Sequence, residues 1–81
     1  MKLSIVVPIG HKDQNFKLLD QLKDKFKDHE IIAACSSQNF EAKKIEEYVD
    51  QFLTIQNSTR AKALNMGAET AKNKLLWFVH L

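Results

Sequence analysis

The stretch LSIVVPIG (residues 3–10) decides the fold class of this chain. Residues 3–7 form a compact, β-branched run, which is typical of a strand that is covered on both faces. Pro8 lacks a backbone donor and Gly10 permits a sharp turn, so the strand is predicted to end at Val7. The first element is therefore predicted to be a buried strand followed by a turn.

Beyond this strand, the spacing of apolar residues switches between the periods of helix and strand. A stripe formed by Phe16, Leu19, Leu22 and Phe26 has lysines and aspartates opposite it, as in an amphipathic helix. The pattern predicts strands at residues 3–7, 30–35, 51–55 and 75–81 and helices at residues 13–26, 40–49 and 60–73. Such alternation with short connections implies an α/β domain in which helices cover a parallel sheet.

In sheets of this kind, ligands bind outside the carboxyl ends of the strands, where the strand order reverses. Topology alone therefore directs attention to the residues that directly follow each strand. These are residues 8–12, residues 35–39, residues 56–60 and His80.

The composition restricts the class of protein. With 81 residues, the chain is expected to form one small domain, and its two glycines and one proline are too few for an all-β fold. The apolar runs at residues 31–35 and 75–79 are each about five residues long, whereas a membrane span needs roughly 20. A net charge of +2 does not by itself imply a polyanionic partner. The single cysteine, Cys35, is compatible with a reducing, cytoplasmic location.

Two segments carry a resemblance to a known family. The first is SIVVPIGH (residues 4–11), and the second is TRAKALNMGA (residues 59–68), which is followed by LLWFVH (residues 75–80). Together they resemble glycosyltransferase family 2, in which a helix with an arginine and an asparagine-x-glycine-alanine motif runs into the strand that carries the metal-binding aspartates. The resemblance implies a truncated Rossmann-like (GT-A-like) three-layer domain over residues 1–81. Its four-stranded parallel sheet would have the order 3-2-1-4, and it would correspond to the N-terminal nucleotide-binding part alone.

The resemblance also implies roles for individual residues, with a nucleotide diphosphate-sugar as the ligand. Residues expected beside the base are Pro8, Ile9, Gly10 and His11, and those expected at the uracil or ribose are Cys35 and Ser36. Arg60 would sit beside the base or the diphosphate, and Asn65 would shape the helix under the sugar-nucleotide. His80 would occupy the first position of the Asp-x-Asp element.

The chain departs from the family pattern at positions that matter for chemistry. Cys35 and Ser36 stand where the family usually has an aspartate pair, so the charge-assisted hydrogen bond to the base is missing. Leu81 lies one residue before the expected metal-binding aspartate. We therefore expect no catalytic residue, no metal ligand and no cofactor in this chain, with Mn²⁺ or Mg²⁺ expected only in a full-length relative. Hexosyl transfer by this chain alone is not expected, and its status as an enzyme is left open.

Each candidate residue also has a structural interpretation. Gly67 either approaches a ligand or permits tight packing of helix on strand, and Asn65 either orients a ligand or bonds to loop backbone. A cation at a helix N-terminus, such as Arg60, is unfavourable unless an anion binds nearby, so it marks an anion site or a plain surface position. Cys35 is either a reactive thiol or an inert buried one. His80 is either a residual metal ligand or a polar group at a strand end.

The last predicted strand suggests a role in association. Trp77, Phe78 and Val79 would line an open sheet edge, which is a template for pairing. A homodimer through this strand is therefore expected, and a non-catalytic α/β association module is the alternative function. Binding to RNA or DNA is a further alternative, through Arg60, Lys62, Lys72 and Lys74. It is disfavoured because these cations are few and no aromatic platform accompanies them, so no nucleic-acid partner is expected.

Overall fold

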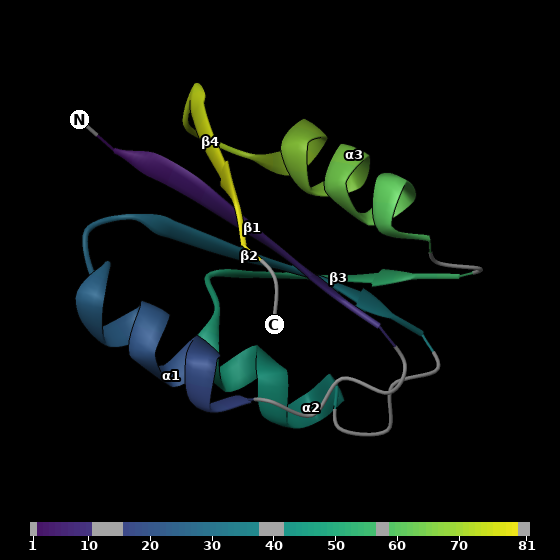
Figure 1. The fold of residues 1–81 in the computed structure, drawn as a ribbon, viewed down its shortest axis with the longest axis horizontal. Coiled ribbons are helices and arrows are strands. Elements are labelled where there is room, and N and C mark those ends of the chain that lie inside the picture. Colours follow the sequence, from purple (N-terminus) through teal and green to yellow (C-terminus); the bar gives the residue numbers. More distant parts are fainter. Residues whose placement is uncertain (1, 11–15, 38–41, 57–58, 80–81) are drawn as a thin grey trace.

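The fold is a four-stranded parallel sheet with helices on both faces (Figure 1). The computed structural model describes residues 2–10, 16–37, 42–56 and 59–79, with the backbone alone for residues 16, 42, 43 and 60. In chain order the elements are β1 (Leu3–Ile9), α1 (Phe16–Lys25), β2 (Glu30–Ser36), α2 (Ala42–Ile45), the 3₁₀ turn η1 (Glu46–Tyr48), β3 (Gln51–Ile55), α3 (Arg60–Thr70) and β4 (Leu75–Phe78). The strand order is β3-β2-β1-β4 with every pairing parallel, which confirms the predicted fold class and strand order.

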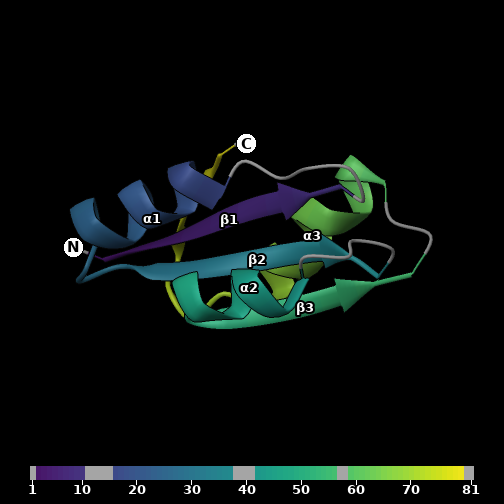
Figure 2. The ribbon, with the colours of Figure 1, turned by 90° about the horizontal axis from the view of Figure 1, so that it is seen from below.

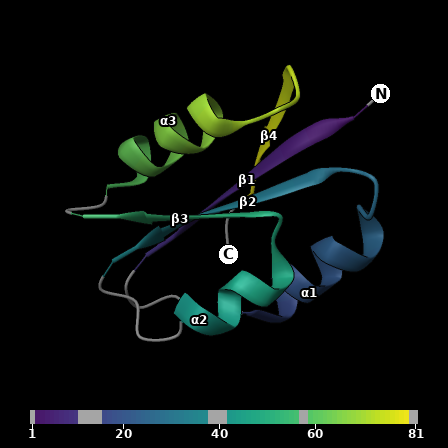
Figure 3. The ribbon, with the colours of Figure 1, turned by 180° about the vertical axis from the view of Figure 1, so that it is seen from behind.

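The molecule has three layers. α1 and α2 cover one face of the sheet and α3 covers the other (Figures 1, 2 and 3). Ile5 and Val7 of β1 belong to the core on the α1 side, whereas Val6 lies against α3. Because β1 is covered on both faces, residues that point to either face are buried, and this explains its successive apolar residues Ile5, Val6 and Val7.

β1 extends through Pro8 to Ile9, two residues beyond the predicted end. The Val79 N–H donates to the Val6 carbonyl at 3.0 Å, so the backbone groups of Val6 are directed toward β4. Backbone groups alternate along a strand, and those of Pro8 therefore have the same direction as those of Val6. β4 ends at Phe78, before it reaches Pro8. The proline therefore removes no bond to β2, and the strand continues past it.

α3 packs on the sheet through small side chains. Ala63 and Gly67 are buried and Leu64 and Ala68 are half-buried, because the spacing of three and four residues places them on one face of the helix. A Cβ atom on Gly67 would overlap Cγ1 of Val6 and would lie 3.2 Å from its Cγ2. The close approach of α3 to β1 requires glycine at this position, which favours the packing interpretation of Gly67.

α3 ends at Thr70, three residues before its predicted end. Ala71 is extended (φ −64°, ψ 135°). The next two backbone N–H groups, of Lys72 and Asn73, donate to the side chains of Glu30 and Ser4. The helix therefore stops where tertiary hydrogen bonds replace the bonds that a further turn would make.

α2 is also shorter than predicted and passes into η1. Val49 is extended (φ −132°, ψ 158°), which ends the helical segment. The extended conformation lets Asp50 pair with Ile31, because the Ile31 N–H donates to the Asp50 carboxylate and the Asp50 N–H donates to the Ile31 carbonyl, both at 2.8 Å. Entry into β3 therefore limits the length of the helix.

β4 forms one edge of the sheet in the described part of the chain. Its four side chains are exposed on both faces: Leu75 by 43%, Leu76 by 38%, Trp77 by 43% and Phe78 by 46%. The strand is shorter than the predicted range 75–81, of which the last two residues lie outside the described ones. Among the described segments, no helix has the length and apolar character needed to cross a membrane.

Candidate functional site

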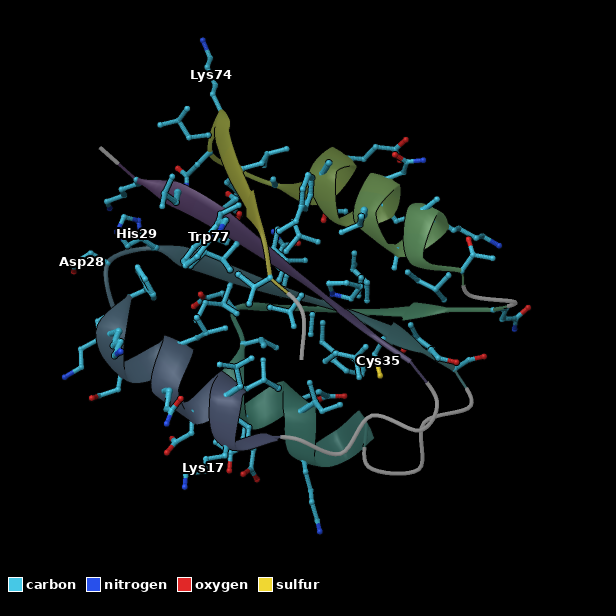
Figure 4. All side chains as sticks on the ribbon, in the orientation of Figure 1. Lys17, Asp28, His29, Cys35, Lys74 and Trp77 are labelled. Atoms are coloured by element: carbon cyan, nitrogen blue, oxygen red, sulfur yellow. The ribbon has the colours of Figure 1, made fainter. Side chains whose placement is uncertain are left out.

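The carboxyl ends of β1, β2 and β3 lie side by side and gather several predicted ligand residues. Ile9 pairs with Cys35 across β1 and β2, and Cys35 pairs with Thr54 across β2 and β3. Pro8 and Ser36 are the neighbours of these paired residues. Cys35 marks this edge in Figure 4, where Lys74 and His29 lie toward the opposite end of the sheet. The predicted topology thus brings these strand ends together.

The side chains at this edge differ in accessibility. Gly10 is exposed and Pro8 is half-buried, but Ile9 is only 1% exposed. Cys35 is fully buried in the core on the α1 side, and its Sγ donates to the Ser36 carbonyl at 3.5 Å. A ligand bound at this edge could therefore contact the exposed end of β1 but not the buried Cys35 thiol. The burial of the thiol favours the inert interpretation of Cys35.

α3 begins beyond the end of β3, at the same edge of the sheet (Figure 2). Its N-cap is Thr59, whose hydroxyl accepts a hydrogen bond from the Lys62 N–H at 3.2 Å. Arg60 is the first residue of the helix, and its side chain lies outside the described part. The Lys62 ammonium donates to the Gln56 carbonyl at 2.9 Å, so this cation is held at the residue that follows β3.

Of the remaining predicted site residues, the structure describes the position of Asn65, which is not at these strand ends. Asn65 is exposed on α3. Ala63 and Gly67 face the sheet, and the helical repeat directs a residue midway between them to the opposite side. His11 and His80 lie outside the described residues.

A buried polar network that the sequence pattern does not predict lies at the amino end of the sheet. Its centre is Glu30, which is 9% exposed. Its Oε1 accepts from the Ser4 hydroxyl and from the Lys72 N–H, both at 2.8 Å, and its Oε2 accepts from the Gln51 amide at 2.7 Å. The Asn73 N–H donates to Ser4 Oγ at 3.1 Å. The network joins three strands to the connection between α3 and β4.

The network favours the ionised form of Glu30. Burial raises the pKa of this carboxyl group. The hydrogen bonds from the Lys72 backbone, the Gln51 amide and the Ser4 hydroxyl, together with the Lys72 charge, outweigh burial, and the pKa is lowered from its ordinary value of 4.5. Since both oxygens accept hydrogen bonds from the protein, we assign Glu30 a structural role.

One signal for this network was present in the sequence. Ser4 interrupts an apolar strand, and Glu30 opens the next one. Each residue is compatible with an exposed strand end when the sequence is considered alone. Only the register, in which Ser4 pairs with Glu30, shows that the two side chains share one buried site.

Two hollows also lie toward the amino end of the sheet. One, of about 320 Å³, is lined in part by Phe26 and Tyr48. The other, of about 400 Å³, has a balanced lining of charged residues: Lys2, Lys27 and Lys72 with Asp28, Glu30 and Asp50. This balance gives the second hollow no preference for a charged ligand of either sign. Within the segments that the structure describes, no three His, Cys, Asp or Glu side chains are grouped as metal ligands.

Comparisons with protein-family models, with curated proteins and with solved structures found no match to this chain. The resemblance to glycosyltransferase family 2 therefore rests on residues 4–11 and 59–80. The chain has a Rossmann-like α/β fold with a parallel sheet of order β3-β2-β1-β4.

Proposed function

We propose that this chain is the N-terminal nucleotide-sugar-binding portion of a family 2 glycosyltransferase-like protein and transfers no sugar by itself. The strand order carries the proposal. β2 and β3 follow β1 on one side, whereas β4 lies on the other side, so the strand order reverses beside β1. Parallel α/β sheets bind ligands outside the carboxyl ends of the strands at such a reversal.

The residues at this position are compatible with a nucleotide. β1 ends in Pro8 and Ile9 and is followed by the exposed Gly10, whose lack of a Cβ permits the close approach of a flat base. The capped N-terminus of α3, with Arg60 as its first residue, lies at the same edge. The positive end of the helix dipole there favours the anionic diphosphate.

Binding is tested by NMR titration of the isotopically labelled chain with uridine and guanosine diphosphates, with and without Mn²⁺. We expect saturable shifts of the Gly10 and Ser36 amides. Arg60→Gln should weaken binding about tenfold, because it removes a charge-assisted contact. Lys74→Gln, at the amino end of the sheet, is the matched control and should leave affinity unchanged. Absence of saturable shifts at millimolar nucleotide would contradict the proposal.

A second candidate function is a non-catalytic α/β module that associates with protein, in the simplest case as a homodimer. The exposure of four consecutive large apolar residues on β4 favours it, because an apolar edge strand without a neighbouring strand is a template for pairing. Sedimentation without nucleotide separates the two functions. Association that is lost in Trp77→Lys but kept in Arg60→Gln supports the module, whereas a monomer at all concentrations contradicts it.

A further inference from the structure

We propose that two copies of this chain pair through β4 in one register, antiparallel about a two-fold axis that passes beside Trp77. The inference rests on the association role proposed above and specifies its geometry. It follows from the direction of the backbone groups along β4, from the side chains on its two faces and from the contrast with the other sheet edge.

The backbone groups of Leu76 and Phe78 face the open edge. The Val79 N–H donates to the Val6 carbonyl at 3.0 Å, so residue 79 is directed toward β1. Direction alternates along a strand, so residues 75 and 77 also face β1, and residues 76 and 78 face away from it. The open edge of β4 therefore presents the N–H and C=O groups of two residues.

One antiparallel register uses both of these residues. In an antiparallel pair of strands, two residues that exchange hydrogen bonds lie directly opposite each other, and the backbone N–H and C=O groups of each are directed toward the other strand. If Leu76 lies opposite the partner's Phe78, symmetry also places Phe78 opposite the partner's Leu76, and both pairs exchange hydrogen bonds. Trp77 then lies opposite the partner's Trp77, beside the two-fold axis. A shift of two residues toward the start of the strand would instead set Lys74 opposite the partner's Phe78. The register centred on Trp77 thus keeps the lysine outside the apolar pairing.

The side chains match in this register on both faces of the sheet. Trp77 pairs with Ile5 of β1 and therefore lies on the α1 face, where its ring contacts Phe26 edge-to-face at 5.3 Å. The two Trp77 rings would meet on that face. On the opposite face, Leu76 and Phe78 of each copy would contact Phe78 and Leu76 of the other. Pairs of aromatic and aliphatic side chains across antiparallel strands are stabilising.

The two edges of the sheet differ in what they present to a partner. Neither β4 (LLWF) nor β3 (QFLTI) contains a charged residue or a proline, although natural edge strands commonly use these to prevent pairing. The edges differ in exposed apolar surface: all four residues of β4 are exposed and apolar, whereas the one exposed residue of β3 is the polar Thr54. This difference directs association to β4.

The size of the patch predicts a reversible dimer. A large aromatic side chain has about 150–250 Å² of surface, and the four side chains of β4 are each 38–46% exposed. The patch therefore offers on the order of 300 Å² per copy, less than the roughly 800 Å² per partner of a standard stable interface. Hydrogen bonds between the strands add to this, and the dimer should dissociate on dilution.

The first test uses proline at positions where the missing N–H faces an open edge. Phe78→Pro removes an outward N–H of β4 while leaving the bonds to β1 in place, so it should give a folded monomer. Thr54→Pro is the matched control on β3. The Ser37 N–H donates to the Ile55 carbonyl, which directs Ile55 toward β2 and Thr54 outward. Sedimentation should show that Thr54→Pro still dimerises, and a folded Phe78→Pro dimer would overturn the proposal.

The second test examines the register by disulfide formation under mild oxidation. Trp77→Cys should cross-link two copies, because directly opposed residues have Cβ atoms about 4.5–5.5 Å apart. Leu75→Cys should not cross-link, because in this register residue 75 of one copy and residue 75 of the other are four positions apart, about 13 Å along the strand. Thr54→Cys and the unsubstituted chain, whose Cys35 is buried, should also remain uncross-linked.

The outcomes separate the register from the association itself. Cross-linking of Leu75→Cys without Trp77→Cys would overturn the register and leave association through β4 standing. A monomer in sedimentation up to about 1 mM, with no cross-link in any variant, would overturn both. Neither result bears on nucleotide binding, which is measured independently at the carboxyl edge.

Discussion

Gly67 and Val6 lie against each other where α3 packs on the sheet. Val6 is fully buried in β1, and the Gly67 backbone lies directly over its side chain. Glycine in a helix interior costs about 1 kcal/mol relative to alanine. The requirement for close packing outweighs this preference, and it explains a glycine that helix propensity disfavours.

Gly67→Ala should therefore lower the free energy of unfolding, by about 1–3 kcal/mol, because the new methyl group overlaps Val6. Chemical denaturation measures the change. The double variant Gly67→Ala with Val6→Ala should lose less than the sum of the two single variants, since the smaller residue in β1 makes room for the methyl group. An increase in stability for Gly67→Ala alone would show that α3 moves freely on the sheet.

At the scale of elements, the Glu30 network attaches the connection between α3 and β4 to the sheet. The connection contributes backbone donors from Lys72 and Asn73, and the Asn73 amide also donates to the Leu3 carbonyl at 3.1 Å. These three bonds are half-buried and directional. The network therefore determines where β4 begins.

Glu30→Gln should destabilise the chain by about 1–3 kcal/mol, because an amide nitrogen replaces one of the two acceptor oxygens and leaves a buried donor unsatisfied. Amide hydrogen exchange should become faster at Lys72 and Asn73 than in the native chain. Glu46→Gln, on an exposed residue of η1, is the matched control and should change neither quantity. Equal protection in both variants would show that the network does not hold the connection.

The same carboxyl group should make stability depend on pH. The pKa of Glu30 is lowered in the folded chain, so its contribution is present in full above the unfolded value of about 4.5 and is lost as the pH falls through the folded pKa. Denaturation at a series of pH values should show the advantage of the native chain over Glu30→Gln shrinking below about pH 4.5. A constant difference over that range would mean that the carboxyl group titrates alike in both states.

The whole molecule is small, and its sheet is unevenly covered. A chain of 81 residues buries a limited share of its surface on folding, and β4 leaves four large side chains exposed. Burial of β4 in a dimer would stabilise the folded state, because a partner that binds only the folded chain shifts the unfolding equilibrium.

The thermal midpoint should therefore rise with protein concentration in the native chain. Each tenfold increase well above the dissociation constant should shift the equilibrium further toward the folded dimer. Calorimetry over a hundredfold range of concentration measures the shift. Phe78→Pro should show a midpoint independent of concentration, and a native chain that behaved in the same way would indicate a monomer.

Much of the architecture was predictable from local patterns. The apolar run at residues 5–7 of β1 and the apolar stripe on α1 reflect burial that repeats with the period of the element, so these elements and their order could be predicted from the sequence. The ends of the elements were less predictable. β1 passes through Pro8, and α3 stops at Thr70, because hydrogen bonds to distant residues decide where each one ends.

The candidate site, like the fold, was predictable in its position in the sheet but not in the burial and direction of its side chains. Topology predicted that the ends of β1 and β2 would meet, and the register brings Ile9 beside Cys35. The burial of the Cys35 thiol and the outward direction of Asn65 depend on which face each residue occupies, which single-residue patterns did not decide.

The sequence by itself determined the alternation of strands and helices, the parallel sheet and the small-residue face of α3, because these follow from periodic burial and chain connectivity. Only the tertiary structure decided that Ser4 and Glu30 share one buried network and that the Cys35 thiol is fully buried. These features arise from contacts between residues far apart in the chain. Register and layer coverage create such contacts, and neither leaves a local pattern in the sequence.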